Sequence, residues 1–448
     1  MSTPAKRLSL SAKRASWPTI QQAKHKDETS VERALHAVDS VLNLLVFMPS
    51  MAFFWRGIWD LYGVYIFPGQ EPLTHWATFA FGSCSIFGYM LLPVCKWAFS
   101  MVSRWPREIL TRIYLIGYSI LYMAYWRGVW SVADYYLFPY DWEAGAIGMA
   151  ICYPTLLILK GSKSTLFPPY VTALDTRGDV LEAGTRFLIK VQRTVLLLLM
   201  NCNQCTETEY SPKWSQPSSI LLYFLDSAFT HFVISTLVIL LWRSMWAIVK
   251  QLFSSMDDHT SDWICFGIGY PSVAILFACE EPIAMLCVYL EKRGWHFAKL
   301  VWENAVFAVA TCTLVFIWRG TWHLNVYYII SDPFLGGWVN LGIGTVLLVS
   351  LQLVSFVGFC GCSVDGTTPG RDGIFPTQYL RVYLMPKIIK IRTKAVEDAT
   401  GEGLPGMIKS DSTKHIMKFD EIAEERDQSN NLDKGIENRA FEESLSKY

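Results

Sequence analysis

The sequence predicts an all-α, multi-pass membrane protein with eight transmembrane helices, arranged as four parallel two-helix repeats in two four-helix halves. Three observations lead to this prediction. The 448 residues are 52% hydrophobic and only 17% charged, whereas soluble domains carry about 25% charged residues. Eight apolar stretches are long enough to cross a bilayer. One five-residue motif returns in alternate stretches, which indicates internal repeats.

A transmembrane helix needs about 20 mostly apolar residues. The fourth predicted span is short as an uninterrupted run, and the sixth contains Glu280, Glu281 and Pro282, which allow it to end near Cys279. The eight predicted spans are residues 39–67, 75–99, 108–138, 143–160, 218–252, 262–290, 300–330 and 336–361.

The distribution of Lys and Arg predicts the orientation of the chain. Connections between spans 1 and 2, 3 and 4, and 7 and 8 contain no Lys or Arg, whereas the alternate connections are rich in both. The positive-inside rule therefore predicts that both termini lie in the cytoplasm. We expect the protein to reside in the plasma membrane. The predicted regions are a basic arm (1–35), a first half (36–160), a cytoplasmic linker (161–217), a second half (218–362) and a largely disordered tail (363–448).

The repeated motif reads Trp-Arg-Gly-x-Trp, and it ends the outer part of each odd-numbered span. Its third copy is degenerate, because Ser244 replaces the Gly. The first and third copies lie 187 residues apart (Trp55 to Trp242), and the second and fourth 192 apart (Trp126 to Trp318), as expected from a duplicated half. The four copies contain Trp55, Arg56 and Trp59; Trp126, Arg127 and Trp130; Trp242, Arg243 and Trp246; and Trp318, Arg319 and Trp322.

Each even-numbered span opens with a Trp that is followed six residues later by a Gly. Small residues let neighbouring helix backbones approach closely in a membrane. We therefore expect these glycines to serve helix packing: Gly82, Gly148, Gly269 and Gly344.

The Trp-Arg-Gly-x-Trp motif is open to three interpretations. The two Trp residues lie one helical turn apart on one face. They could form an aromatic belt at the headgroups, with Arg reaching outward. The Arg could instead stack on Trp and pair with an acid such as Asp60 or Asp134. Finally, the four Arg could converge on an outer vestibule that binds an anion or a lipid headgroup.

The sequence carries no catalytic, cofactor or metal motif, so we expect a protein that is not an enzyme. The formal net charge of +0 gives no reason to expect nucleic acid as a partner. Cys202 and Cys205 lack a second pair for a zinc site. Cys360 and Cys362 are candidates for palmitoylation, and Ser9 and Ser16 for phosphorylation by basophilic kinases.

Together, the eight spans, the cytoplasmic termini and the motif at 55–59, 126–130 and 318–322 resemble the Fuseless family of multi-pass membrane proteins. The resemblance covers residues 36–362. It implies a neuronal protein that organises the presynaptic active zone, with a scaffold or calcium-channel complex as partner, and that localises voltage-gated calcium channels for synaptic transmission. The alternative is a transporter or ion channel built from the four hairpins. The lipid bilayer is a partner in both cases, and no oligomeric state is predicted.

Overall fold

The computed structural model describes residues 31, 33–137, 142–172, 175, 217–357, 374–375, 377, 379–380, 384 and 387–388. The chain divides into two units, His36–Gln378 on the one hand and Met1–Leu35 with Tyr379–Tyr448 on the other. The unit His36–Gln378 contains all the helices from η1 to η4.

The secondary structure of the described residues is helical. Each half contains a five-residue π-helical segment that begins twelve residues before a motif Trp, at Asn43 before Trp55 and at Thr230 before Trp242. The elements are η1 (Asn43–Phe47), α2 (Met48–Tyr65), α3 (Leu73–Ser83), α4 (Ser85–Ser100), α5 (Arg104–Tyr136), α6 (Trp142–Ile158), η2 (Ser162–Thr165), α8 (Pro217–Phe229), η3 (Thr230–Ile234), α9 (Ser235–Leu252), α10 (Asp258–Ala278), α11 (Glu280–Lys292), α12 (His296–Tyr328), α13 (Pro333–Ser350) and η4 (Val354–Val357).

Among the residues that the structure describes, six helices are long and apolar enough to cross a membrane: Arg33–Tyr65, Leu73–Ser100, Leu221–Leu252, Asp258–Ala278, His296–Tyr328 and Pro333–Ser350. The third and fourth predicted spans fall on α5 and α6, which are not among them. Helix α6 has only 17 residues. Helix α5 has 33 residues, but it is rich in Tyr and also carries Arg residues.

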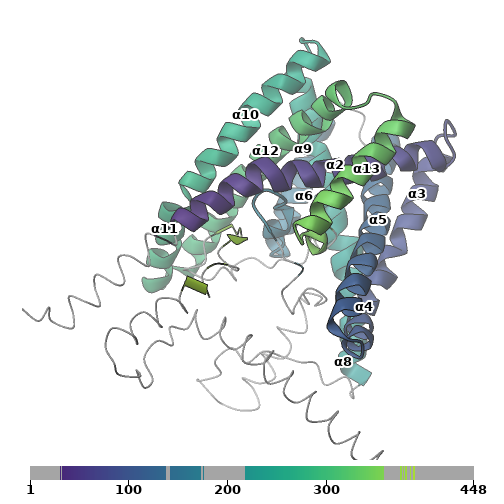
Figure 1. Cartoon of the computed structure of the whole chain (residues 1–448). Coiled ribbons are helices and arrows are strands. Elements are labelled where there is room, and N and C mark those ends of the chain that lie inside the picture. Colours follow the sequence, from purple (N-terminus) through teal and green to yellow (C-terminus); the bar gives the residue numbers. More distant parts are fainter. Residues whose placement is uncertain are drawn as a thin grey trace, which may run out of the picture. The chain divides into compact units, whose positions relative to one another are not determined.

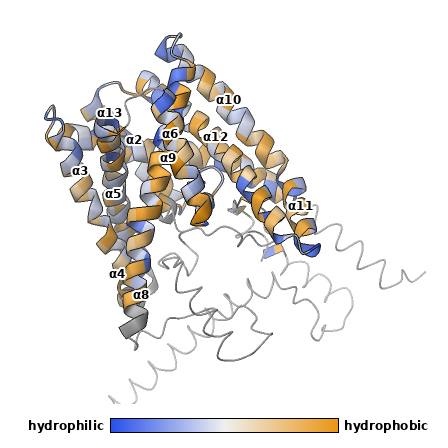
Figure 2. Cartoon of the chain, turned by 180° about the vertical axis from the view of Figure 1, so that it is seen from behind, coloured by the Kyte–Doolittle hydropathy of each residue, from blue (hydrophilic) through white to orange (hydrophobic). Residues whose placement is uncertain are grey.

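Apolar side chains cover the outside of the helices. Figure 2 shows apolar residues along the helices and hydrophilic residues gathered at their ends. Phe87 of α4, Ile113 of α5 and Val346 of α13 are all more than 60% exposed. A surface of this kind suits a lipid environment, in which exposed apolar side chains carry no penalty.

Four helices, α2, α5, α9 and α12, contact one another in a closed ring: α2 with α5, α5 with α9, α9 with α12, and α12 with α2. Each of the other long helices packs most extensively against one of these four, namely α3 on α5, α6 on α9, α10 on α12 and α13 on α2. We call the four ring helices the inner helices and the helices packed on them the outer helices. Each outer helix packs on the inner helix that comes next in the sequence, and the last outer helix, α13, packs on the first inner helix, α2 (Figure 1).

Local sequence determines several helix ends. The carboxylates of Asp257 and Asp332 accept N-cap hydrogen bonds from Thr260 N (2.8 Å) and Leu335 N (2.6 Å) at the starts of α10 and α13. After α6 and α13, Lys160 and Gln352 adopt φ values of 52° and 57°. The next residue in each case donates its N–H to the carbonyl five residues back, at Leu156 and Leu348. Both ends are Schellman motifs in which the residue with positive φ is not a glycine.

Candidate functional site

The first Trp of every motif copy faces the centre of the ring. Neighbouring ring centroids lie 5.3 Å apart for Trp55 and Trp126, 6.2 Å for Trp126 and Trp242, 6.1 Å for Trp242 and Trp318, and 5.2 Å for Trp318 and Trp55. All four are at most 5% exposed. These contacts exclude the aromatic-belt interpretation for the first Trp, because a belt residue sits at the headgroups. We call this set the inner tryptophan layer.

The second Trp of each copy forms a further layer one helical turn along, the outer tryptophan layer. Trp59 meets Trp130 at 6.1 Å and Trp322 at 5.7 Å, and Trp130 meets Trp246 at 5.7 Å, all with edge-to-face geometry. Residues i and i+4 share a helix face, so one motif supplies both layers. Because first Trp meets first and second meets second, the four helices run in the same direction.

Each motif Arg reaches toward the preceding helix of the ring. Arg56 lies over Trp322 at 5.2 Å, Arg127 over Trp59 at 5.4 Å, and Arg319 over Trp246 at 5.9 Å. The Nη1 of Arg127 also donates to Trp59 O at 3.0 Å. Cation–π contacts of this kind contribute about 0.5–2 kcal/mol, more where water is excluded.

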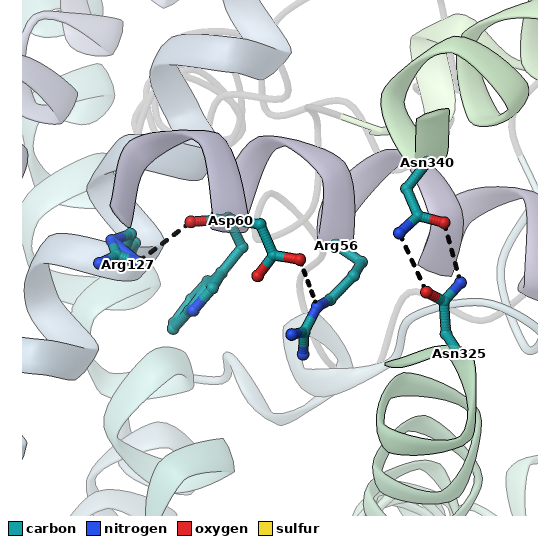
Figure 3. Close-up of polar contacts among 6 residues, drawn as sticks. Arg56, Asp60, Arg127, Asn325 and Asn340 are labelled. Carbon is teal, nitrogen blue, oxygen red and sulfur yellow. Dashed lines mark hydrogen bonds and ion pairs between the residues drawn. The ribbon is translucent and has the colours of Figure 1, made fainter. Parts of the chain in front are cut away.

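Arg243 follows the same sense, but through an acid: its Nε donates to Oδ1 of Asp134 on α5 at 2.6 Å. Arg56 pairs with Asp60 of its own helix at 2.7 Å (Figure 3), and Arg319 with Asp262 of α10 at 3.4 Å. Arg243 is 0% and Arg319 3% exposed. These contacts therefore match the stacking-and-pairing interpretation, except that Asp134 pairs with Arg243 of the next helix.

Phe167, which follows η2, occupies the inner tryptophan layer. Its ring lies 5.6 Å from Trp55, 5.3 Å from Trp126 and 5.1 Å from Trp242, and it is 1% exposed. The indole N–H groups of Trp242 and Trp318 donate to the backbone carbonyls of Thr165 (3.1 Å) and Pro168 (2.9 Å). We call residues 162–172 the plug loop, because the side chain of Phe167 packs among the tryptophans of the inner layer.

Polar contacts attach the plug loop to the inner helices. Thr165 bonds Thr311 at 2.6 Å, Tyr170 bonds Thr313 at 2.7 Å, and the Thr172 hydroxyl donates to Asn43 Oδ1. The loop thereby touches both α12 and the helix that leads into α2. A buried segment with its polar groups satisfied in this way is held firmly.

Asp175, three residues after the plug loop, forms contacts with η4 and α5. Its carboxylate accepts from Ser355 N (2.7 Å) and Val354 N (3.2 Å) in η4, and it lies 3.8 Å from Arg112 of α5. Burial raises the pKa of Asp175 above 3.8, and the backbone and hydroxyl hydrogen bonds of Ser355, the Val354 N–H and the Arg112 charge offset part of this rise.

Glycines make the contacts between outer and inner helices close. A Cβ on Gly344 of α13 would lie 2.6 Å from Phe54 Cα of α2, and one on Gly269 of α10 would lie 2.6 Å from Ile317 Cα of α12. Gly82 of α3 approaches Tyr125 of α5 in the same way. The fourth predicted packing residue, Gly148, instead meets the side chain of Ser244.

The glycines of the motif complete these contacts from the other side. Gly57, Gly128 and Gly320 each approach the backbone of the outer helix that packs on them. Backbone approach of this kind needs a residue without a side chain on each helix. The Gly of the motif therefore packs against an outer helix, while its Trp residues fill the centre of the ring.

Comparison with known families gives one match: a family model described as Fuseless matches residues 34–357. The chain belongs to the Fuseless family. The match covers every helix described above, from the helix that leads into α2 to η4. No curated protein matches the chain, and neither does any solved structure.

A second segment of this Fuseless protein lies against the plug loop. Phe375 is 1% exposed and stacks on Tyr170 with ring centroids 4.4 Å apart. Its N–H donates to Glu280 Oε1 at 3.0 Å, and Glu280 Oε2 lies 2.9 Å from His36 Nε2. Phe277 borders both aromatic rings, 5.3 Å from Tyr170 and 6.1 Å from Phe375.

Sequence reasoning missed Phe167, Tyr170, Glu280 and Phe375. One signal could have found two of them. Leu166-Phe167-Pro168 and Ile374-Phe375-Pro376 are matching apolar triplets inside polar stretches, each downstream of the last span of a half. The other predicted sites, Ser9, Ser16, Cys202, Cys205, Cys360 and Cys362, lie outside the described residues.

An aromatic belt is formed by residues other than the motif. Trp76, Trp263 and Trp338, which open or lie near the start of α3, α10 and α13, are exposed, and each donates to a Tyr hydroxyl of the adjacent inner helix at 3.3 Å. The Tyr partners are Tyr136, Tyr328 and Tyr65. Exposed Trp and Tyr at one level suit a membrane–water interface.

Proposed function

We propose that this Fuseless protein is a non-enzymatic organiser of the presynaptic active zone that localises voltage-gated calcium channels for synaptic transmission. It crosses the plasma membrane eight times, as four parallel two-helix repeats, with both termini in the cytoplasm. The presynaptic assignment rests on the family resemblance. What the geometry adds is support for a rigid membrane scaffold whose cytoplasmic segments are available to partners.

Helix lengths support the eight crossings. At 1.5 Å per residue, the 33 residues of α5 extend about 50 Å and the 17 residues of α6 about 25 Å, close to the roughly 30 Å of a bilayer core. The low hydropathy of α5 follows from its Tyr residues, several of which, such as Tyr118, Tyr122 and Tyr125, are buried inside the protein. A helix with that inner face can still present apolar residues to lipid.

One observation carries the proposed function: the centre of the ring is filled and tied to cytoplasmic segments. The inner tryptophan layer closes around Phe167, and the plug loop connects this layer to Phe375 at the root of the tail. A core built in this way is suited to hold its cytoplasmic segments in fixed positions. An organiser needs such positions for its partners.

The channel or transporter alternative has one observation in its favour, the presence of four Arg at one level of four inner helices. Their contacts weigh against it, because they are engaged by neighbouring Trp and Asp side chains. Flux through reconstituted liposomes tests it with the native chain and with Phe167→Ala. Selective ion or solute flux by the native chain would contradict the organiser proposal.

Co-purification and imaging test the organiser proposal directly. The tagged full-length chain is expressed in neurons that lack the endogenous protein and is purified from their membranes under mild detergent, with the untagged chain as control. We expect enrichment of voltage-gated calcium-channel subunits and active-zone scaffold proteins, together with restored channel density at active zones. No enrichment and unchanged channel density would overturn the proposal.

A further inference from the structure

Two segments that are far apart in sequence contact each other close to the inner tryptophan layer. The plug loop contributes Tyr170, which is 0% exposed, and the segment that follows η4 contributes Ile374, Phe375 and Thr377, each 1% exposed. Their contact is the stack of Tyr170 on Phe375 at 4.4 Å and 28°. Neither segment belongs to a long helix, so their burial depends on this mutual contact and on their anchors.

Within the plug loop, Tyr170 is only three residues from Phe167, which contacts the inner tryptophan layer. Tyr170 N donates to Phe167 O at 2.9 Å, so both residues belong to one tight turn. Phe167 contacts three members of the inner tryptophan layer, and the next residue, Pro168, accepts from Trp318. A displacement of Tyr170 therefore moves Phe167 as well.

Glu280 holds the other segment in place. This carboxylate is 2% exposed, accepts from Phe375 N at 3.0 Å, and pairs with His36 at 2.9 Å. Glu280 thus joins the residue that leads into the tail to the start of the first helix. Hydrogen bonds to a buried carboxylate are among the stronger ones in proteins.

From these contacts we propose that Ile374, Phe375 and Thr377 form a strap that locks the plug loop, so that release of these residues loosens the inner tryptophan layer. The order of coupling is Glu280 to Phe375, Phe375 to Tyr170, and Tyr170 through its turn to Phe167. The strap is a two-position element: engaged, it buries both segments, and released, it exposes the stacked aromatic faces. The inference does not require the proposed synaptic function.

Hydrogen–deuterium exchange on the full-length protein in lipid nanodiscs tests the strap. The reporters are the amides of Ser164, Leu166 and Tyr170 in the plug loop, each of which donates to the carbonyl three residues back. Phe375→Ala removes the stack, and Glu280→Gln weakens the anchor. We expect both variants to speed exchange of the plug loop by about tenfold or more, as local opening becomes easier.

Two control variants separate coupling from general damage. Glu281→Gln changes the adjacent, exposed acid and should leave plug-loop exchange at the native rate. Phe375→Leu keeps an apolar group at the same place and should restore most of the protection. Peptides from α3 and α13 should keep their native rates in every variant.

Two results would overturn the proposal. In the first, Phe375→Ala speeds exchange at residues 374–377 but leaves the plug loop protected, which would make the two segments independent. In the second, exchange rises equally in the plug loop, α3 and α13, which would mean that Phe375 merely stabilises the whole fold.

Discussion

Close approach of α13 to α2 at Gly344 can be tested with a matched pair of substitutions on one helix. A Cβ at position 344 would lie 2.4 Å from Phe54 N, whereas ordinary contact begins at 3.4 Å, so the two backbones must separate by about 1 Å. A Cβ at Gly342 would meet nothing within 4 Å. Both substitutions to Ala remove the same intrinsic helix penalty of Gly, roughly 0.5–1 kcal/mol.

The difference between the two variants therefore isolates the packing effect. Overpacking costs about 1–3 kcal/mol, and each kcal/mol corresponds to about 1 °C in a chain of this size. We expect Gly344→Ala to unfold about 1–3 °C below Gly342→Ala in a thermal melt in detergent. Gly269→Ala and Gly267→Ala should differ in the same direction, since only position 269 approaches a neighbouring backbone. Equal melting temperatures within both pairs would refute the close approach.

Three further perturbations have defined outcomes. Arg243→Leu removes the ion pair with Asp134 and should lower stability by about 3–5 kcal/mol, with recovery when Asp134→Leu is added; a double variant as unstable as the single one would contradict this pairing. Gln352→Gly relieves a φ of 57° and should raise the melting temperature by the equivalent of about 1 kcal/mol. Because the pKa of Asp175 is raised in the folded state, the contribution of this residue to stability is full below pH 3.8 and is lost as pH rises through the folded-state pKa. In melting curves between pH 4 and 7, the melting temperature of Asp175→Asn should therefore rise relative to that of the native chain. A constant difference in melting temperature would count against the raised pKa.

Sequence periodicity could predict which faces of the helices matter. The spacing of Trp55 and Trp59 places both on one side of a helix, and in the structure both point into the ring with their counterparts. The same reasoning could not give the partner of each helix. Gly82 and Gly128 indicate close packing, but small residues carry no information about which backbone will approach them.

Average hydropathy gives only part of the picture. Helix α5 has a low average because its Tyr residues are polar by this measure, although Tyr122 and Tyr125 are buried against α9. Average hydropathy likewise passes over Phe167, because a single aromatic residue between Thr165 and Pro168 leaves the average of its polar stretch almost unchanged. The tertiary role of such a residue depends on contacts more than 70 positions away, as with Trp242.

The pairing of α13 with α2 has a consequence for biosynthesis. Helix α2 leaves the ribosome near the beginning of translation, while α13, which must cover Gly57 and Phe54, is completed some 285 residues later. At the elongation rates of about 5–20 residues per second, that face waits for many seconds without its natural neighbour. A message that stops before α13 would release a product whose first helix has an open seam, which is the sort of surface that membrane quality control recognises.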